Sequence, residues 1–192
     1  MKSRICDIKK LMTEELQNGS NDLVTRDTGI AIRSRIEKEL MNINEGDILF
    51  IDFSRIGVID YSCSDEIIAK LISRLIGLEY GDKYIVLTGV NPNQLENIEV
   101  ALERKKLAVL GINSDNSWMV IGKLNNYLAA TLELVMGKRR ITTREFAESK
   151  NIELNTSGTR LLNLYKKRFV ARIEETTEEG GRQYVYKSLI FK

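Results

Sequence analysis

The sequence predicts an α/β domain followed by a smaller α+β domain. Two short runs, ILFI at 48–51 and KYIVLT at 83–88, are typical of buried strands. Helical patterns alternate with them, as expected for a sheet with helical cover. Near Gly122 the pattern changes to helices followed by a hairpin, so we expect domains at 1–122 and 123–192.

The composition is typical of a soluble globular protein. Charged residues make up 29% and apolar residues 43% of the 192 positions, which is enough chain for a normal core. No apolar run approaches the roughly 20 residues of a membrane span, and the N-terminus lacks the core of a signal peptide. The two cysteines, Cys6 and Cys63, suggest reduced thiols. We therefore expect a cytoplasmic protein without a membrane partner.

Histidine is absent, which excludes several kinds of site. The chain has no imidazole general base, no Ser-His or Cys-His couple and no histidine metal ligand. Two cysteines alone do not make a structural zinc site, and the chain lacks a P-loop and a dinucleotide fingerprint. We therefore expect that the protein is not an enzyme and carries no metal or cofactor.

The charge is distributed unevenly along the chain. Residues 1–122 hold 15 Lys and Arg against 19 Asp and Glu, a balance of −4. Residues 123–192 hold 14 against 8, a balance of +6. A basic C-terminal third indicates an anionic partner for that part of the chain.

The first domain begins with an arm, residues 1–22, whose structure is hard to assign. Its apolar residues have helical spacing up to the break NGSND at 18–22, so a short helix and a loop are expected. A second helix follows, capped by Thr25 or Asp27, and runs to about Met41.

The remaining elements of this domain follow from its second buried run. After the strand at 83–88, a turn leads into a helix from Pro92 to about Lys106, because proline suits the first turn of a helix. Two short strands, 107–110 and 118–121, complete the sheet.

The domain is organised around residues 46–66, GDILFIDFSRIGVIDYSCSDE. A buried strand and a second short extended piece lead through Asp60 to Ser62, which precedes an amphipathic helix. Ser62 is expected to cap this helix, and Asp60 to orient its hydroxyl or accept backbone donors. The N-terminus of such a helix is positive and tolerates a phosphate.

This part of the chain resembles a STAS domain, the fold of anti-sigma factor antagonists. The resemblance lies in the order of its elements: a strand, Asp-x-Ser, a short apolar segment, Asp-x-Ser and a helix. The resemblance covers about 23–107. The sequence SCSDE at 62–66 is similar to the Ser-Phe-Ala-Asp-Glu pattern of a divergent STAS-like family, which has no settled function. In the antagonists, a partner kinase phosphorylates the serine that Ser62 matches. The resemblance therefore implies a phosphoacceptor, Ser62, surrounded by Asp60 and Asp65, and a regulatory protein or kinase as partner.

The simpler interpretation of Ser62 is that it only caps the helix. A phosphate would add about −1.5 to −2 charge beside Asp60, Asp65 and Glu66. We prefer the cap because of this repulsion.

The second domain is predicted to begin with three helices. The first ends at Gly137, and Thr142 or Thr143 caps the second. Thr156 or Ser157 caps the third. Two strands joined by a hairpin follow them, which gives the order helix, helix, turn, helix, strand, hairpin, strand.

This order resembles the winged helix-turn-helix domain over about 123–190. The third helix would be the recognition helix, and strands at 169–173 and 183–186, joined by TTEEGGR, would form the wing. Arg168 stands where glycine often ends the recognition helix, so some backbone strain is expected there. The resemblance implies contact with double-stranded DNA. The implied DNA-binding residues are Ser157, Thr159, Arg160, Asn163, Lys166, Lys167 and Arg182.

Four glutamates of the predicted wing, Glu174, Glu175, Glu178 and Glu179, would repel a phosphate backbone. A homodimer would compensate by bringing two recognition helices to adjacent major grooves. A winged helix used for protein contacts or dimerisation is the alternative to DNA binding.

We therefore expect a transcriptional regulator in which a STAS-like domain senses a partner or a small ligand and a winged helix binds DNA. The alternative is an antagonist-like, partner-switching signalling protein, phosphorylated on Ser62, that binds proteins and not DNA.

Overall fold

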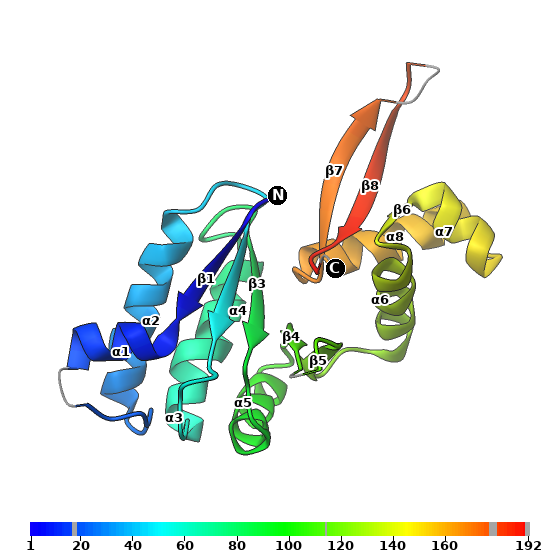
Figure 1. Cartoon of the computed structure of the whole chain (residues 1–192). Helices are drawn as coiled ribbons and strands as arrows, with labels where there is room; N and C mark the ends of the chain where they lie inside the picture. The colour runs from blue at the N-terminus through cyan, green and yellow to red at the C-terminus, as the bar shows by residue number, and fades with distance from the viewer. Residues whose placement is uncertain (17–18, 114, 177–179, 191–192) are drawn as a thin grey trace. The chain divides into compact units, whose positions relative to one another are not determined.

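The computed structural model describes residues 1–16, 19–113, 115–176 and 180–190, and it is an α/β structure with two sheets (Figure 1). By their contacts the residues divide into two compact units, Met1–Lys123 and Leu124–Lys192. This division lies one residue beyond the predicted boundary, and independent folding of each unit stays a prediction. Within the described ranges, no helix is long and apolar enough to cross a membrane.

The first unit contains a five-stranded sheet in which the strands follow chain order. The strands are β1 (Ser3–Asp7), β2 (Ile48–Asp52), β3 (Tyr84–Thr88), β4 (Ala108–Ile112) and β5 (Trp118–Gly122). The first four are parallel, and β5 runs antiparallel to β4. The four predicted strands are confirmed. The prediction that the arm starts as a helix is wrong, because β1 pairs with β2 and the helix begins only at Ile8.

Helices connect the strands of this sheet. They are α1 (Ile8–Leu16), α2 (Arg26–Met41), α5 (Pro92–Arg104) and a continuous helical stretch made of α3 (Tyr61–Ser64), η1 (Asp65–Ala69) and α4 (Lys70–Ile76). Thr25 caps α2, as predicted, by accepting a hydrogen bond from the Thr28 backbone N–H. The segment η1 is π-helical, a rare form that occurs mostly as a single turn within an α-helix and is frequent at functional sites.

One face of the sheet shares a core with these helices. Leu49, Ile51, Ile85, Leu87 and Val109 belong to a single cluster of buried side chains. The same cluster contains the buried faces of α1, α2, α4 and α5, so burial of apolar surface fixes the helices on the sheet.

The loop that leads into α3 is held from both sides. Its extended piece lies outside the sheet and forms an isolated parallel bridge between Ile59 and Leu23. Side-chain amides of α5 bond to its backbone: Gln94 Nε2 donates to the Ile56 carbonyl at 2.7 Å, and Asn97 Nδ2 donates to the Ile59 carbonyl at 3.1 Å. These bonds fix the residues at the start of α3.

The second unit combines three helices with a three-stranded antiparallel sheet of order β6-β8-β7. Its helices are α6 (Asn126–Lys138), α7 (Thr143–Lys150) and α8 (Leu154–Lys166), and its strands are β6 (Arg140–Thr142), β7 (Val170–Thr176) and β8 (Arg182–Ser188). The predicted helices and the β7–β8 hairpin are confirmed. The short strand β6 was not predicted.

The helix ends of the second unit differ partly from prediction. Thr142 caps α7, as expected, in a capping box. However, α6 continues through Gly137, and α8 begins after Glu153, which makes no side-chain cap. The prediction that Thr156 or Ser157 caps α8 is wrong because both lie within its first turn.

Arg168, just after α8, has the strained backbone that the sequence predicts. Its φ of 66° lies in the left-handed region, which is uncommon for a residue with a side chain. Its guanidinium lies 5.2 Å from the ring centre of Tyr165, and the residue is buried. Glycine would adopt this backbone conformation more easily, but Arg168 has a side chain that is packed in place.

Candidate functional sites

The helix start that follows β2 is capped by Asp60. The Asp60 carboxylate accepts a hydrogen bond from the Cys63 backbone N–H at 2.7 Å. The Ser62 hydroxyl donates to the two Asp60 oxygens at 2.9 and 3.0 Å. The prediction that Ser62 caps the helix is therefore wrong, because the helix begins at Tyr61 and its cap, Asp60, lies two residues before Ser62. The expected roles of Asp60, orienting this hydroxyl and accepting a backbone donor, are confirmed.

The Cys63 thiol beside this pair is inert. Cys63 is buried, and its Sγ donates to the Thr25 carbonyl at 2.9 Å. Burial, followed by the charge of Asp60, raises the pKa of the Cys63 thiol to about 12. The thiol therefore stays protonated at neutral pH, whereas the Ser62 hydroxyl is only half-buried.

Two buried carboxylates follow in the π-helical segment η1. Glu66 is 1% exposed, and its oxygens lie 2.6 Å from Arg26 Nη1 and 2.6 Å from Arg33 Nη1, with Lys70 Nζ as a third partner. Asp65 Oδ1 lies 2.6 Å from Lys105 Nζ. Asp65 forms its ion pairs with Lys105 and Arg26, and its place beside the Ser62 hydroxyl stays a prediction.

The backbone around these carboxylates is closely packed. The i to i+5 hydrogen bonding of a π-helix widens the turn, and residues 63–69 are all buried. Helix α2 approaches this turn closely at Gly29, where an added Cβ would lie 2.9 Å from Cβ of Glu66. A side chain at this position would push α2 away and separate Arg26 and Arg33 from Glu66.

Glu66 is ionised in this environment. Burial by itself raises the pKa of Glu66, but the hydrogen bond from Lys70 and the charges of Lys70, Arg33 and Arg26 together lower it. The buried carboxylate therefore keeps its negative charge and holds three cations around it.

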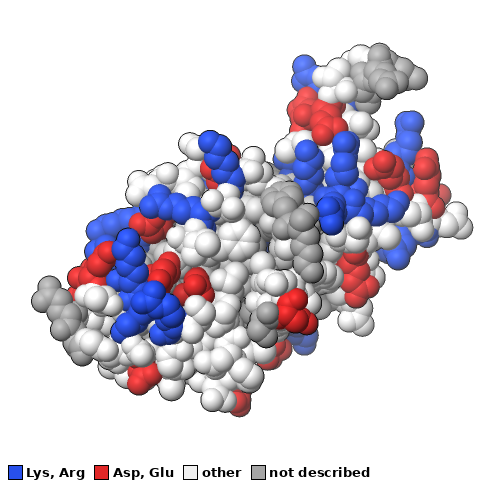
Figure 2. All heavy atoms as spheres, in the orientation of Figure 1, with Lys and Arg blue, Asp and Glu red and all other residues white. Residues whose placement is uncertain are grey.

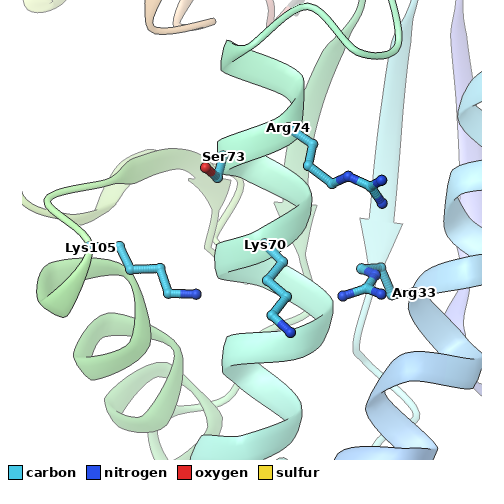
Figure 3. A pocket seen from close by; sticks show the side chains of 5 residues that line it. All are labelled: Arg33, Lys70, Ser73, Arg74 and Lys105. Atoms are coloured by element: carbon cyan, nitrogen blue, oxygen red, sulfur yellow. The ribbon is translucent and has the colours of Figure 1, made fainter.

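A hollow of about 370 Å³ lies beside this network, and we call it the basic hollow. It is lined by Arg33, Lys70, Ser73, Arg74 and Lys105 (Figure 3). These residues come from α2, from α4 and from the end of α5. Figure 3 shows Lys105, Lys70 and Arg33 extending toward one another across one turn of the helix. Four of the five lining residues carry a positive charge.

Sequence reasoning missed the basic hollow. Arg33 and Lys70 lie in amphipathic helices, and Lys105 follows the last residue of α5. Each residue is ordinary in its own element, since charged side chains cover most exposed helix faces. One signal was available in the sequence. Asp65 and Glu66 directly precede an apolar helix face, which could have suggested that these cations have buried partners.

In the second unit, α8 presents a polar face to solvent. Asn155, Thr156, Thr159 and Lys166 are exposed, and their spacing places Asn155, Thr159 and Lys166 along one side of the helix. The sequence of α8, LNTSGTRLLNLYK, contains no aspartate or glutamate. The four exposed residues therefore carry hydrogen-bonding groups and one positive charge, and none of them is acidic.

The predicted DNA-binding residues of α8 do not all lie on this face. Ser157 is fully buried and donates a hydrogen bond to the Thr143 carbonyl at 2.5 Å, so it joins α8 to α7. It is not available to a ligand, and its prediction as a DNA-binding residue is wrong. Arg160 is half-buried, with its guanidinium 5.7 Å from the ring centre of Tyr127 in α6.

The other predicted residues of α8 remain accessible in different degrees. Thr159 is exposed, but its hydroxyl donates to the Asn155 carbonyl at 2.9 Å and can only accept from a ligand. Lys166 is exposed, whereas Asn163 and Lys167 are half-buried. Lys166 is thus the cation of this helix that meets solvent most directly.

The described glutamates of the β7–β8 hairpin are paired with cations. The side chain of Arg182 is 83% exposed and lies 3.3 Å from Glu174. Glu175 lies 2.9 Å from Arg140 and 3.8 Å from Lys187. These pairs offset the repulsion that the glutamates would exert on an anionic partner.

The other two glutamates of the predicted wing, Glu178 and Glu179, lie outside the described residues. Figure 2 shows Lys and Arg side chains clustered on the second unit beside the acidic patch of the hairpin. On the visible face of this unit, positive charge therefore outweighs negative charge.

Arg172 connects the hairpin to α8, and sequence reasoning did not identify it. Its guanidinium lies 4.5 Å from the ring centre of Tyr165 in α8 and 4.4 Å from that of Tyr184 in β8. Stacking of an arginine on two rings is a cation–π arrangement that restrains all three side chains. It fixes the hairpin base next to the end of α8.

Comparison with protein families and with curated proteins assigns no role to these residues. Among the side chains that the structure describes, no three His, Cys, Asp or Glu residues gather in a way that could hold a metal ion. No protein-family model matches the sequence, and no curated protein matches it. The geometry of the two units is therefore the basis on which their function is inferred.

Proposed function

We propose that the chain is a transcriptional regulator in which the second unit is a winged helix that binds duplex DNA and the first is a STAS-like sensing domain. The observation that carries the proposal is the solvent-facing side of α8, which has exposed polar and basic side chains and no acidic residue. Its neighbouring hairpin has the order and position of a wing.

The geometry gives the α8 residues different roles in this proposal. Asn155 and Thr159, near the N-terminal end of α8, are placed where a recognition helix contacts base edges. Lys166 lies at the other end, where a phosphate is the more suitable partner. Arg160 would leave the Tyr127 ring to reach DNA, so its contribution to binding includes the loss of that stacking.

A binding titration with genomic DNA fragments at two salt concentrations tests this proposal. Lys166→Ala and Lys167→Ala should weaken binding to all sequences alike and lower the slope of log affinity against log salt by about 0.9 for each lost phosphate contact. Arg160→Ala should reduce sequence preference, since a good base contact discriminates by about 1–3 kcal/mol.

Lys150→Ala, at the exposed end of α7, is the matched control and should leave binding unchanged. Circular dichroism would confirm that each variant is folded. Absence of binding at low salt, or equal binding by the wild type and all three α8 variants, would favour a protein-contact role for the second unit.

A partner-switching protein is the second candidate function, and the Asp60–Ser62 pair favours it. The Ser62 hydroxyl lies in the first turn of a helix and is half-buried rather than fully buried. Mass spectrometry of the protein isolated from its native cells would decide between the roles of Ser62. A phosphate on Ser62 would support the switch, whereas an unmodified residue under all growth conditions would leave the DNA-binding role.

A further inference from the structure

The basic hollow of the first unit has the features of a ligand site. We infer that it binds a small phosphorylated molecule, which would be the ligand that this unit senses. This inference goes beyond DNA binding and stands independently of it, because all the residues of the hollow lie in the first unit.

The charges beside the hollow are arranged in two layers. The side chains of Lys70, Arg74 and Lys105 are 39%, 41% and 35% exposed. Glu66, the partner of Lys70, is 1% exposed, and Asp65, the partner of Lys105, is 10% exposed. Arg74 pairs instead with Glu37 and Glu79, which are 20% and 51% exposed. An anion that approaches Lys70 and Lys105 from solvent therefore meets these two cations first, while the buried carboxylates hold them in place.

The network also has more positive than negative groups. Its ion pairs join five cations to four carboxylates. The cations are Arg26, Arg33, Lys70, Arg74 and Lys105, and the carboxylates are Glu37, Asp65, Glu66 and Glu79. A single excess positive charge remains, so binding of an anion completes the charge balance of the network.

The donors that line the hollow suit the oxygens of a phosphate. An ammonium group has three N–H donors and a guanidinium has five, and the carboxylates occupy only part of them. Ser73 adds an exposed hydroxyl. A phosphate group offers several acceptor oxygens at once, which neither a chloride nor an apolar ligand does.

The size and surroundings of the hollow favour a small molecule over a nucleic acid. Its volume of about 370 Å³ exceeds many times the ~30 Å³ share of one water molecule, so it holds a phosphate and part of the group that carries it. Residues 1–122 have a net charge of −4, which repels a long polyanion. A small anion seated within the hollow interacts with the nearby cations, because more distant surface charges are screened over about 10 Å.

Titration of the full-length protein with inorganic phosphate and with pyrophosphate, by calorimetry in a low-salt buffer, tests this inference. We expect saturable binding at one site per chain, with pyrophosphate bound more tightly. Ser73→Asp places a negative charge in the hollow without removing an ion pair, and Lys70→Gln removes one cation. Each should lower the affinity at least tenfold.

Matched controls on α2 separate a site from a general charge effect. Ser34→Asp and Lys38→Gln make the same charge changes at exposed positions that do not line the hollow, and should change the affinity less than twofold. Lys166→Gln should also have no effect, which would exclude phosphate binding by the second unit.

Absence of saturable binding by the wild type, or binding that Ser73→Asp and Lys70→Gln leave unchanged, would overturn the inference. The cluster would then have a structural role only. If Lys70→Gln fails to fold, Ser73→Asp decides alone, since it keeps every cation and carboxylate of the network.

Discussion

Replacing the buried carboxylate Glu66 by an amide of the same shape should destabilise the first unit strongly. Removal of one partner from a buried ion pair typically costs about 3–5 kcal/mol, because the charge left behind is uncompensated. Among the partners of Glu66, Lys70 and Arg26 are 39% and 53% exposed, so water takes over part of their solvation. Arg33, at 15%, keeps little contact with solvent.

We therefore expect Glu66→Gln to lower the free energy of unfolding by an amount at the lower end of that range, about 3 kcal/mol. For a unit of this size the loss corresponds to a decrease in Tm of about 12 °C. The fluorescence of Trp118, the single tryptophan of the chain, follows unfolding of the first unit selectively because it lies in β5. A urea titration monitored in this way gives the change directly.

Glu79→Gln is the matched control. Glu79 is 51% exposed and pairs with Arg74 at the surface, so its replacement should cost about 0–1 kcal/mol. If Glu66→Gln and Glu79→Gln have the same midpoint in urea, the buried network does not stabilise the unit and the reasoning fails.

The same comparison has a defined pH dependence. Because folding lowers the pKa of Glu66, its ion pairs stabilise the folded state above the ordinary pKa of a glutamate, about 4.3. This contribution is lost as the pH falls through the lowered pKa. The difference in stability between the wild type and Glu66→Gln should therefore be complete at neutral pH and become small in strong acid.

Three further predictions concern the boundary between the units and two helix caps. Limited proteolysis should cut between Ile121 and Leu124 and release two fragments that each melt cooperatively; an uncut chain and unfolded fragments would contradict this. Asp60→Ala should cost about 0.5–2 kcal/mol in urea denaturation because it removes the cap of α3, whereas Ser62→Ala should cost less; the reverse order would contradict the assignment of the cap. Thr142→Ala should lower the Tm of the second unit by breaking its capping box, a loss of about 0.5–2 kcal/mol that circular dichroism would detect, and a Tm equal to that of the wild type would show that the box adds no stability.

Most of the fold could be predicted because buried strands and amphipathic helices leave local patterns in a sequence. The strand β1 left none: its first three residues are exposed, with Ile5 at 71%, and its apolar residues continue the spacing of the helix that follows. The strand β6 is only three residues long and ends at the cap of α7. The strands β1 and β6 form because they pair with strands that are distant in the sequence, and a local sequence pattern does not indicate such pairing.

The candidate sites were less predictable than the fold because they depend on tertiary contacts. The roles of Asp60 and the exposure of Lys166 follow from local helix positions, and these could be predicted. Ser157 was misassigned because a serine in the first turn of a helix can face solvent or a neighbouring helix equally well. The basic hollow requires knowledge of how α2, α4 and α5 pack together, which depends on the close approach at Gly29.

The strand order of the two sheets has a consequence for synthesis on the ribosome. In the first unit each strand pairs with the strand that precedes it in the chain, so its sheet can grow by addition at one edge as the polypeptide emerges. In the second unit β6 and β7 both pair with β8, and β6 closes a loop from Arg140 to Lys187. The wing strand β7 and the short strand β6 therefore have no partner until β8 has left the exit tunnel. A nascent chain arrested before β8 should therefore hold a folded first unit beside an incomplete second one.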